Sequence, residues 1–99
     1  MSRLAIEFLH AAREEFIEAS RWYENKRAGL GMEFIAEIER CLTFATERPL
    51  QFALVRADIR RVVASRFPYS VYFRAEAHRI VVVAKFHGRR DPKIWPDRT

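Results

Sequence analysis

The chain has 99 residues, of which 49% are hydrophobic and 31% charged, which excludes an intrinsically disordered chain and predicts one domain over residues 1–99. A single cysteine, Cys41, excludes an internal disulfide and favours a reducing compartment, so a cytoplasmic protein is expected. No apolar run approaches the ~20 residues of a membrane span, and no signal-peptide pattern opens the sequence.

Charge is divided unevenly between the two halves of the chain. Residues 1–50 hold seven basic and nine acidic side chains, a net charge of −2, whereas residues 51–99 hold eleven basic and four acidic, a net charge of +7. An excess confined to one half favours an acidic partner, such as nucleic acid or an acidic protein surface, over charge that serves solubility alone.

Two helices are predicted in the first half, after a short apolar run at residues 4–9 that would open a sheet. The first helix is expected over about residues 11–26, because apolar residues recur there at helical spacing. Gly29-Leu30-Gly31 predicts a turn, and Pro49 predicts the end of the second helix. The second helix carries an apolar stripe made of Phe34, Ile35, Ile38, Leu42 and Ala45. The two helices should therefore form a hairpin.

The second half is strand-like. Strands are predicted over residues 59–66, 69–74 and 79–86, with a break at Phe67-Pro68-Tyr69 and a short loop at residues 75–78. Residues 52–55 fit either a short extra strand or a loop. The continuous apolar run at residues 80–86 favours an interior position in the sheet. The expected fold is α+β in the order β-α-α-β-β-β, with the helical hairpin packed on a largely antiparallel sheet.

Side chains that usually carry enzyme chemistry are poorly arranged. The three histidines and Cys41 lack zinc-site spacing, and no glycine-rich phosphate loop is present, so neither a metal nor a cofactor is expected. Ser65 and Ser70 lack the Gly-x-Ser-x-Gly context of an activated nucleophile. Cys41 should lie in the core. Solvated helix faces, not a catalytic pair, are expected for Glu14, Glu15, Glu18, Glu33, Glu37 and Glu39.

Basic and aromatic side chains concentrate instead toward the C-terminus. Arginine outnumbers lysine nine to two in residues 51–99, and aromatic residues lie between these cations. Residues 87–99 alone hold four Lys or Arg side chains, two Asp, one His and one Trp. Guanidinium groups bind phosphates and carboxylates through paired hydrogen bonds, so this half of the chain is expected to bind a partner.

Several motifs, taken in order, resemble the toxin of ParE/RelE-type toxin–antitoxin modules over nearly the whole chain. The more specific of them are Phe67-Pro68-Tyr69 and the closing H-x-x-R-D-P-x-x-W of residues 87–95. The weaker ones are Phe16, Trp22-Tyr23, Gly29-x-Gly31-x-x-Phe34, Pro49 and Arg60-Arg61.

The RelE-like branch of this family cleaves messenger RNA in the ribosomal A site without a metal, through basic residues and a tyrosine near the C-terminus. If the chain resembles this branch, its catalytic residues are Arg61, Arg89 and Arg90. Val63 replaces an expected lysine, Ser70 an expected arginine, and Trp95 the tyrosine. An indole has no hydroxyl with which to transfer a proton.

The ParE-like branch poisons DNA gyrase and causes growth arrest, and the R-D-P-x-x-W ending is more similar to this branch. The resemblance therefore implies a non-enzymatic bacterial toxin of the plasmid-stabilisation type. On this reading the target-binding residues are Arg61, Arg66, His87, Arg89, Arg90, Asp91 and Trp95. The alternatives are the RelE-like endoribonuclease and an inactive relative or simple nucleic-acid-binding module.

The resemblance also implies a cognate antitoxin, encoded in the adjacent reading frame and joined to the toxin in a hetero-oligomer. Apolar antitoxin side chains would enter a groove between the helical hairpin and the sheet, and acidic ones would meet the basic half of the chain. The residues expected to bind it are Phe16, Trp22, Tyr23, Phe34, Arg60 and Arg74.

Overall fold

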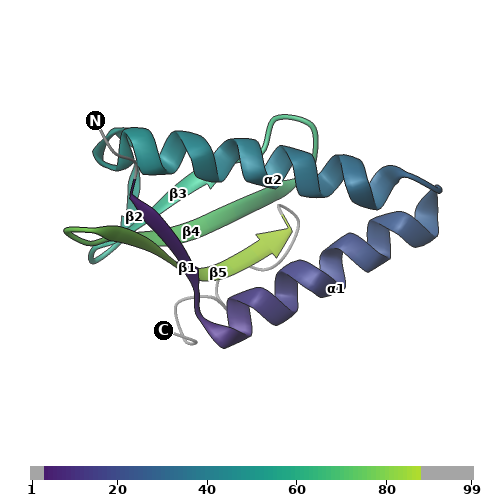
Figure 1. The fold of residues 1–99 in the computed structure, drawn as a ribbon, viewed down its shortest axis with the longest axis horizontal. Helices are drawn as coiled ribbons and strands as arrows, with labels where there is room; N and C mark the ends of the chain where they lie inside the picture. Colours follow the sequence, from purple (N-terminus) through teal and green to yellow (C-terminus); the bar gives the residue numbers. More distant parts are fainter. Residues whose placement is uncertain (1–3, 88–99) are drawn as a thin grey trace.

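The computed structural model describes the backbone of residues 4–87 and the side chains of residues 4–83 (Figure 1). The chain opens with strand β1 (Ala5–Phe8), helix α1 (His10–Lys26) and helix α2 (Leu30–Glu47). A short 3-10 helix η1 (Pro49–Gln51) leads to strands β2 (Leu54–Arg56), β3 (Ile59–Val63), β4 (Tyr69–Ala75) and β5 (Arg79–His87). No helix within the described residues is long and apolar enough to cross a membrane.

The strands form one five-stranded sheet in the order β1-β5-β4-β3-β2. Strand β1 runs parallel to β5, and every other neighbouring pair is antiparallel. The predicted α+β fold and the interior place of the last strand are therefore confirmed. Of the two alternatives for residues 52–55, the structure has the short strand, β2, at the edge of the sheet. One boundary differs from the prediction: β3 ends at Val63 and not at residue 66, because residues 64–68 bend toward α2.

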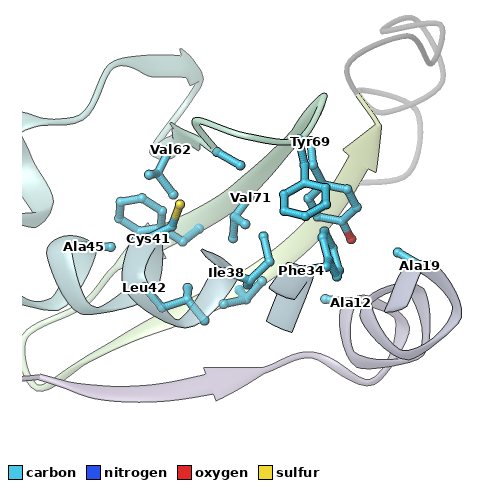
Figure 2. Packing of buried hydrophobic residues seen from close by; sticks show 14 of the residues in the cluster. Ala12, Ala19, Phe34, Ile38, Cys41, Leu42, Ala45, Val62, Tyr69 and Val71 are labelled. Atoms are coloured by element: carbon cyan, nitrogen blue, oxygen red, sulfur yellow. The ribbon is translucent and has the colours of Figure 1, made fainter. Parts of the chain in front are cut away.

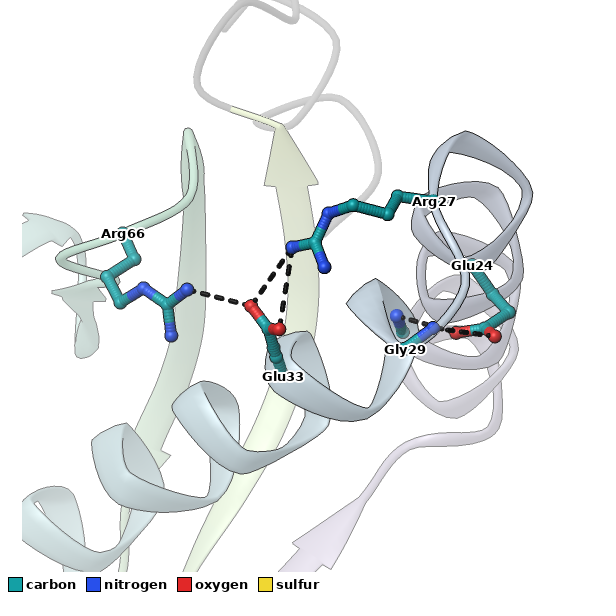
Figure 3. Close-up of polar contacts among 6 residues, drawn as sticks. Glu24, Arg27, Gly29, Glu33 and Arg66 are labelled. Atoms are coloured by element: carbon teal, nitrogen blue, oxygen red, sulfur yellow. Dashed lines mark hydrogen bonds and ion pairs between the residues drawn. The ribbon is translucent and has the colours of Figure 1, made fainter.

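The turn between the helices depends on two glycines and one carboxylate. Gly29 has a φ of 91°, a left-handed conformation that glycine adopts without strain. The Glu24 carboxylate accepts hydrogen bonds from the Gly29 and Gly31 N–H groups, at 3.0 and 2.9 Å, and so caps the start of α2 (Figure 3). A Cβ on Gly31 would lie 2.8 Å from the Ser20 carbonyl oxygen, so this position requires glycine for the helices to meet.

One apolar core fills the space between the helical hairpin and the sheet (Figure 2). Helix α2 supplies most of its helical side: Phe34, Ile38, Cys41, Leu42 and Ala45. The sheet supplies the other side: Val62, Tyr69, Val71, Phe73, Ile80 and Val82. The predicted core position of Cys41 is confirmed, and burial raises the pKa of its thiol to about 11, which keeps it protonated and unreactive.

The ring of Phe34 joins the hairpin to the sheet. Its centroid lies 4.9 Å from that of Tyr23 on α1, 5.3 Å from that of Phe67 and 4.7 Å from that of Tyr69 on β4. Its contacts with Phe67 and Tyr69 are edge-to-face, an arrangement that adds to the free energy of simple burial. Phe34 is fully buried, so removing its ring would leave a cavity in the core in place of these contacts.

Replacing Phe34 with Ala should lower the free energy of unfolding by about 3–5 kcal/mol, because the cavity borders α1, β4 and the β3–β4 loop. Urea denaturation followed by circular dichroism measures this loss. Phe44→Ala is the matched control, because Phe44 lies on the same helix with its ring largely exposed, and it should cost less than about 1 kcal/mol. Equal losses in the two variants would contradict the central place given to Phe34.

Candidate functional site

The candidate binding surface is the face of the sheet turned away from the helices, which we call the open face. Strand alternation and cross-strand pairing bring its residues together: Ile59 lies opposite Arg74, Arg61 opposite Tyr72, and Val63 opposite Ser70. Ile59 packs here with Tyr72 and Val83 in an apolar cluster separate from the main core. The open face is therefore a small apolar floor with polar and basic side chains around it.

Arg61 is a cation of this face that forms no ion pair among the described residues, as is Arg56, which lies opposite Ile59. Arg74 and Arg79 both donate to the Glu76 carboxylate, at 3.1 and 2.7 Å, and Arg79 also donates to Glu7 at 2.6 Å. These hydrogen bonds lower the pKa of Glu76, Arg79 contributing most, so its negative charge is secure. Arg61 is exposed and remains able to bind an anion.

The positions next to Arg61 carry no charge. Val63 and Ser70 are cross-strand partners, and the Val63 side chain is 58% exposed whereas Ser70 is buried. A lysine and an arginine at these positions would form a cationic cluster with Arg61 on one face of the sheet. Next to Arg61, the open face therefore offers an uncharged pair where RelE-like chemistry would require further cations.

The β3–β4 loop, residues 64–68, borders the open face and is fixed to helix α2 by Glu37. One carboxylate oxygen of Glu37 accepts hydrogen bonds from the Ser65 N–H at 2.7 Å and the Ser65 hydroxyl at 3.0 Å. Arg40 donates to both oxygens, at 3.0 and 2.6 Å. These bonds, that from Arg40 foremost, lower the pKa of Glu37 to about 2 despite its burial.

Glu33 holds the next part of the same loop. Its carboxylate accepts a hydrogen bond from Arg66 at 2.8 Å and from Arg27 at 3.3 Å, so it joins the loop to the hairpin turn (Figure 3). Arg66 lowers the pKa of Glu33 most, followed by Arg27. The prediction of a solvated helix face is thus wrong for Glu37, which is buried, and incomplete for Glu33. Glu33 pairs with Arg66 from the distant loop, whereas Glu37 pairs with Arg40 at i,i+3 on the same helix and with Ser65 of the loop.

The residues expected to bind an antitoxin lie in three different environments. Tyr23 and Phe34 are buried in the core, and Phe16 is half-buried between the rings of Phe8 and Phe34. Trp22 is exposed on the outside of the hairpin, with the Lys26 ammonium 4.7 Å from its ring.

At the far end of the sheet, Arg60 donates to the Phe52 carbonyl at 2.8 Å, while Arg74 is paired with Glu76. These six residues do not form one surface, because three of them serve the packing of hairpin on sheet. Their role in antitoxin binding stays a prediction.

Of the residues expected to bind the target, the structure describes the side chains of Arg61 and Arg66. Arg61 lies on the open face, whereas Arg66 lies on the β3–β4 loop and its guanidinium pairs with Glu33 of α2. The backbone of His87 pairs with Tyr69 at the end of β5. The described residues do not include Arg89, Arg90, Asp91 and Trp95, whose roles stay predictions.

A second feature was not expected from the sequence. A shallow hollow of about 340 Å³ lies where α2 ends, lined by Phe44, Glu47, Arg48, Gln51 and Phe52. The only sign of this hollow in the sequence is a run of apolar residues after Pro49, which follows neither helical nor strand periodicity. Within the described residues, no group of three or more His, Cys, Asp or Glu side chains is placed to hold a metal ion.

Comparison with known proteins gives a match in structure and none in sequence. No protein-family model and no curated protein matches the sequence. The fold is similar to that of a chain in the solved structure described as "Chromosomal ParDE TA system from P. aeruginosa", with a TM-score of 0.70 and 14% sequence identity. The match covers 86% of this chain and 96% of that chain. The ParE/RelE-like fold inferred from the sequence motifs is therefore confirmed.

The Glu37 contacts predict a defined dependence of stability on pH. Because folding lowers the pKa of Glu37 from 4.5 to about 2, its contribution is complete above pH 4.5 and is lost as the pH falls toward 2. Glu37→Gln should therefore lower the free energy of unfolding by about 1–3 kcal/mol at pH 7. The difference from the unsubstituted chain should shrink steadily between pH 4.5 and 2.

Urea denaturation at a series of pH values measures this difference. Glu39→Gln is the control, since Glu39 is exposed on the same helix and should show no such dependence. If the loss of unfolding free energy in Glu37→Gln stays constant from pH 7 to pH 2, the charge of the carboxylate does not hold the loop in place.

Proposed function

We propose that this chain is the toxin of a two-component toxin–antitoxin module, that it inhibits DNA gyrase by binding, and that a cognate antitoxin neutralises it. The shared fold with a chain from a ParDE system supports the toxin role. The observation that favours binding over RNA cleavage is the uncharged Val63–Ser70 pair beside Arg61 on the open face.

The physical argument rests on what metal-free RNA cleavage requires. The attacking 2′-hydroxyl must lose a proton, and the phosphorane that forms must be stabilised by cations fixed within hydrogen-bonding distance. Valine supplies neither a proton acceptor nor a cation, and a neutral serine hydroxyl is a weak substitute for a guanidinium. Loss of several members of such a set reduces rates by orders of magnitude.

The same surface suits a binding role. Arg61 is an exposed, unpaired guanidinium beside the apolar floor of Ile59, Tyr72 and Val83. Guanidinium groups fixed next to an apolar patch are typical of surfaces that bind proteins or nucleic-acid phosphates. Gyrase with its bound DNA presents both kinds of partner.

One observation favours the alternative ribonuclease. Arg61 and Tyr72 are direct cross-strand partners, so a cation and a phenol lie next to each other on the open face. If the chain is such a ribonuclease, Arg61, Arg89 and Arg90 would be its catalytic residues. The two functions are separated by whether purified protein cuts RNA on the ribosome or stabilises cleaved DNA on gyrase.

Purified protein added to gyrase and supercoiled plasmid should increase the amount of linear, gyrase-linked DNA, and expression alone should arrest growth. Arg61→Glu should reduce the accumulation of cleaved DNA by at least about tenfold, because it reverses an unpaired charge beside the apolar floor of the open face. Arg13→Glu, an exposed arginine on α1, is the matched control and should keep full activity. Agarose gels after denaturation of gyrase provide the measurement.

The ribosome assay supplies the contradicting outcome. Primer extension on messenger RNA translated in vitro should show no A-site cuts when the protein is added. A-site cuts that disappear in Arg61→Ala, together with an inactive gyrase assay, would replace the proposed function by the ribonuclease. Expression without growth arrest would contradict both functions and favour an inactive relative.

A further inference from the structure

The hollow at the end of α2 is lined by aromatic rings together with polar side chains. Phe44, Glu47 and Arg48 come from the last turn of α2 and its C-terminal cap, and Gln51 and Phe52 come from η1 and the residue after it. The volume of about 340 Å³ is at the small end of the range for sites that hold small molecules. This lining suits a flat ligand that carries polar groups on its edge.

The walls of the hollow are a fixed part of the fold. The Arg48 N–H donates to the Phe44 carbonyl at 3.0 Å, which closes the end of α2. The Arg60 guanidinium donates to the Phe52 carbonyl at 2.8 Å, and the Phe52 ring lies 5.9 Å from that of buried Phe73. A ligand would therefore meet a site that is already formed, so little free energy is lost in ordering it.

Phe44 provides an accessible ring at this site. It is 48% exposed, and the Arg40 guanidinium lies over its ring at 5.4 Å from the centroid. The cation helps to hold the ring in place, since it is attracted to the aromatic face. Exposed aromatic rings next to polar groups stack on flat groups such as nucleobases.

The polar side chains of the hollow are available to a ligand. Glu47, Arg48 and Gln51 form no side-chain hydrogen bond or ion pair among the described residues, although two of them are neighbours in the chain and opposite in charge. Together they offer a carboxylate that accepts, a guanidinium that donates and an amide that does both. A ligand that matches all three must carry donors and acceptors on its edge.

The two charges of the lining decide among flat ligands. An aromatic acid would pair with Arg48, but its charge would lie close to Glu47 and to the last carbonyls of α2, the negative end of the helix dipole. An aromatic amine would pair with Glu47, but its charge would lie close to Arg48. A neutral ring with donors on one part of its edge and acceptors on another meets both charges favourably.

We propose that the hollow binds a guanine base. The N1–H and N2–H groups of the base donate to the Glu47 carboxylate, its O6 and N7 accept from the Arg48 guanidinium, and its ring stacks on Phe44. Arginine pairs with these two acceptors of guanine more often than with those of any other base. Adenine has an acceptor at N1, which would face the carboxylate without a hydrogen bond. The inference does not rest on the proposed function.

NMR titration of the full chain with guanosine 5′-monophosphate tests the proposal. Backbone amides of residues 44–52 should show saturable shifts at or below about 1 mM nucleotide. Adenosine 5′-monophosphate should bind at least about tenfold more weakly, and inosine 5′-monophosphate, which lacks the N2 amino group, should fall between the two. The phosphate and ribose are common to all three, so differences report the base alone.

Glu47→Gln should weaken binding of the guanine nucleotide by at least about tenfold, and that of the inosine nucleotide by less, because the N2 donor is missing there. Phe44→Ala should weaken the binding of all three nucleotides, because the stacking ring is lost. Glu39→Gln and Met32→Ala are the matched controls, since both residues are exposed on the same helix, and they should bind as the unsubstituted chain does. Thermal melts confirm that the variants are folded.

A guanine base can be supplied by a free nucleotide or by a nucleic-acid strand. Two oligothymidylates of equal length, one with a central guanine, distinguish these sources: tighter binding of the guanine-containing strand than of the mononucleotide assigns the site to nucleic acid, and the reverse order assigns it to free nucleotide. The proposal is overturned by an absence of saturable shifts in residues 44–52, by equal affinity for the three mononucleotides, or by unchanged affinity in Glu47→Gln.

Discussion

The structure depends on the burial of one apolar stripe of α2 between α1 and the sheet. Phe34 is the centre of this packing, since its ring contacts Tyr23 on one side and Phe67 and Tyr69 on the other. The same helix fixes the β3–β4 loop through two carboxylates, Glu33 and Glu37, that accept hydrogen bonds from loop residues. Helix α2 thus determines both the core and the shape of the surface beside it.

Because the helices cover one face of the sheet, partners must be met by the other face, the loops and the sheet edges. On the open face Arg61 lies beside the uncharged Val63–Ser70 pair, and the proposal of binding over metal-free RNA cleavage rests on this charge pattern.

Much of this fold could be predicted from sequence periodicity. The helical stripe, the glycine turn and the long apolar run of β5 each follow from local pattern, and the structure agrees with them. The parallel pairing of β1 with β5 could not be predicted, because it joins residues more than seventy positions apart. Burial of Glu37 was missed because the i,i+3 spacing from Arg40 predicts only a surface ion pair, and nothing local to α2 reveals that Ser65, 28 residues away, also donates to the carboxylate. Strand β2 has only three residues, too few for an alternating pattern.

The central claim is that the open face and the β3–β4 loop contact the target. Hydrogen–deuterium exchange of the chain, alone and with gyrase and DNA, tests this most directly. Binding should slow exchange in residues 61–70, above all in the loop at residues 64–68, and leave the outer surface of α1 unchanged. Protection confined to α1, with unchanged exchange in residues 61–70, would contradict it.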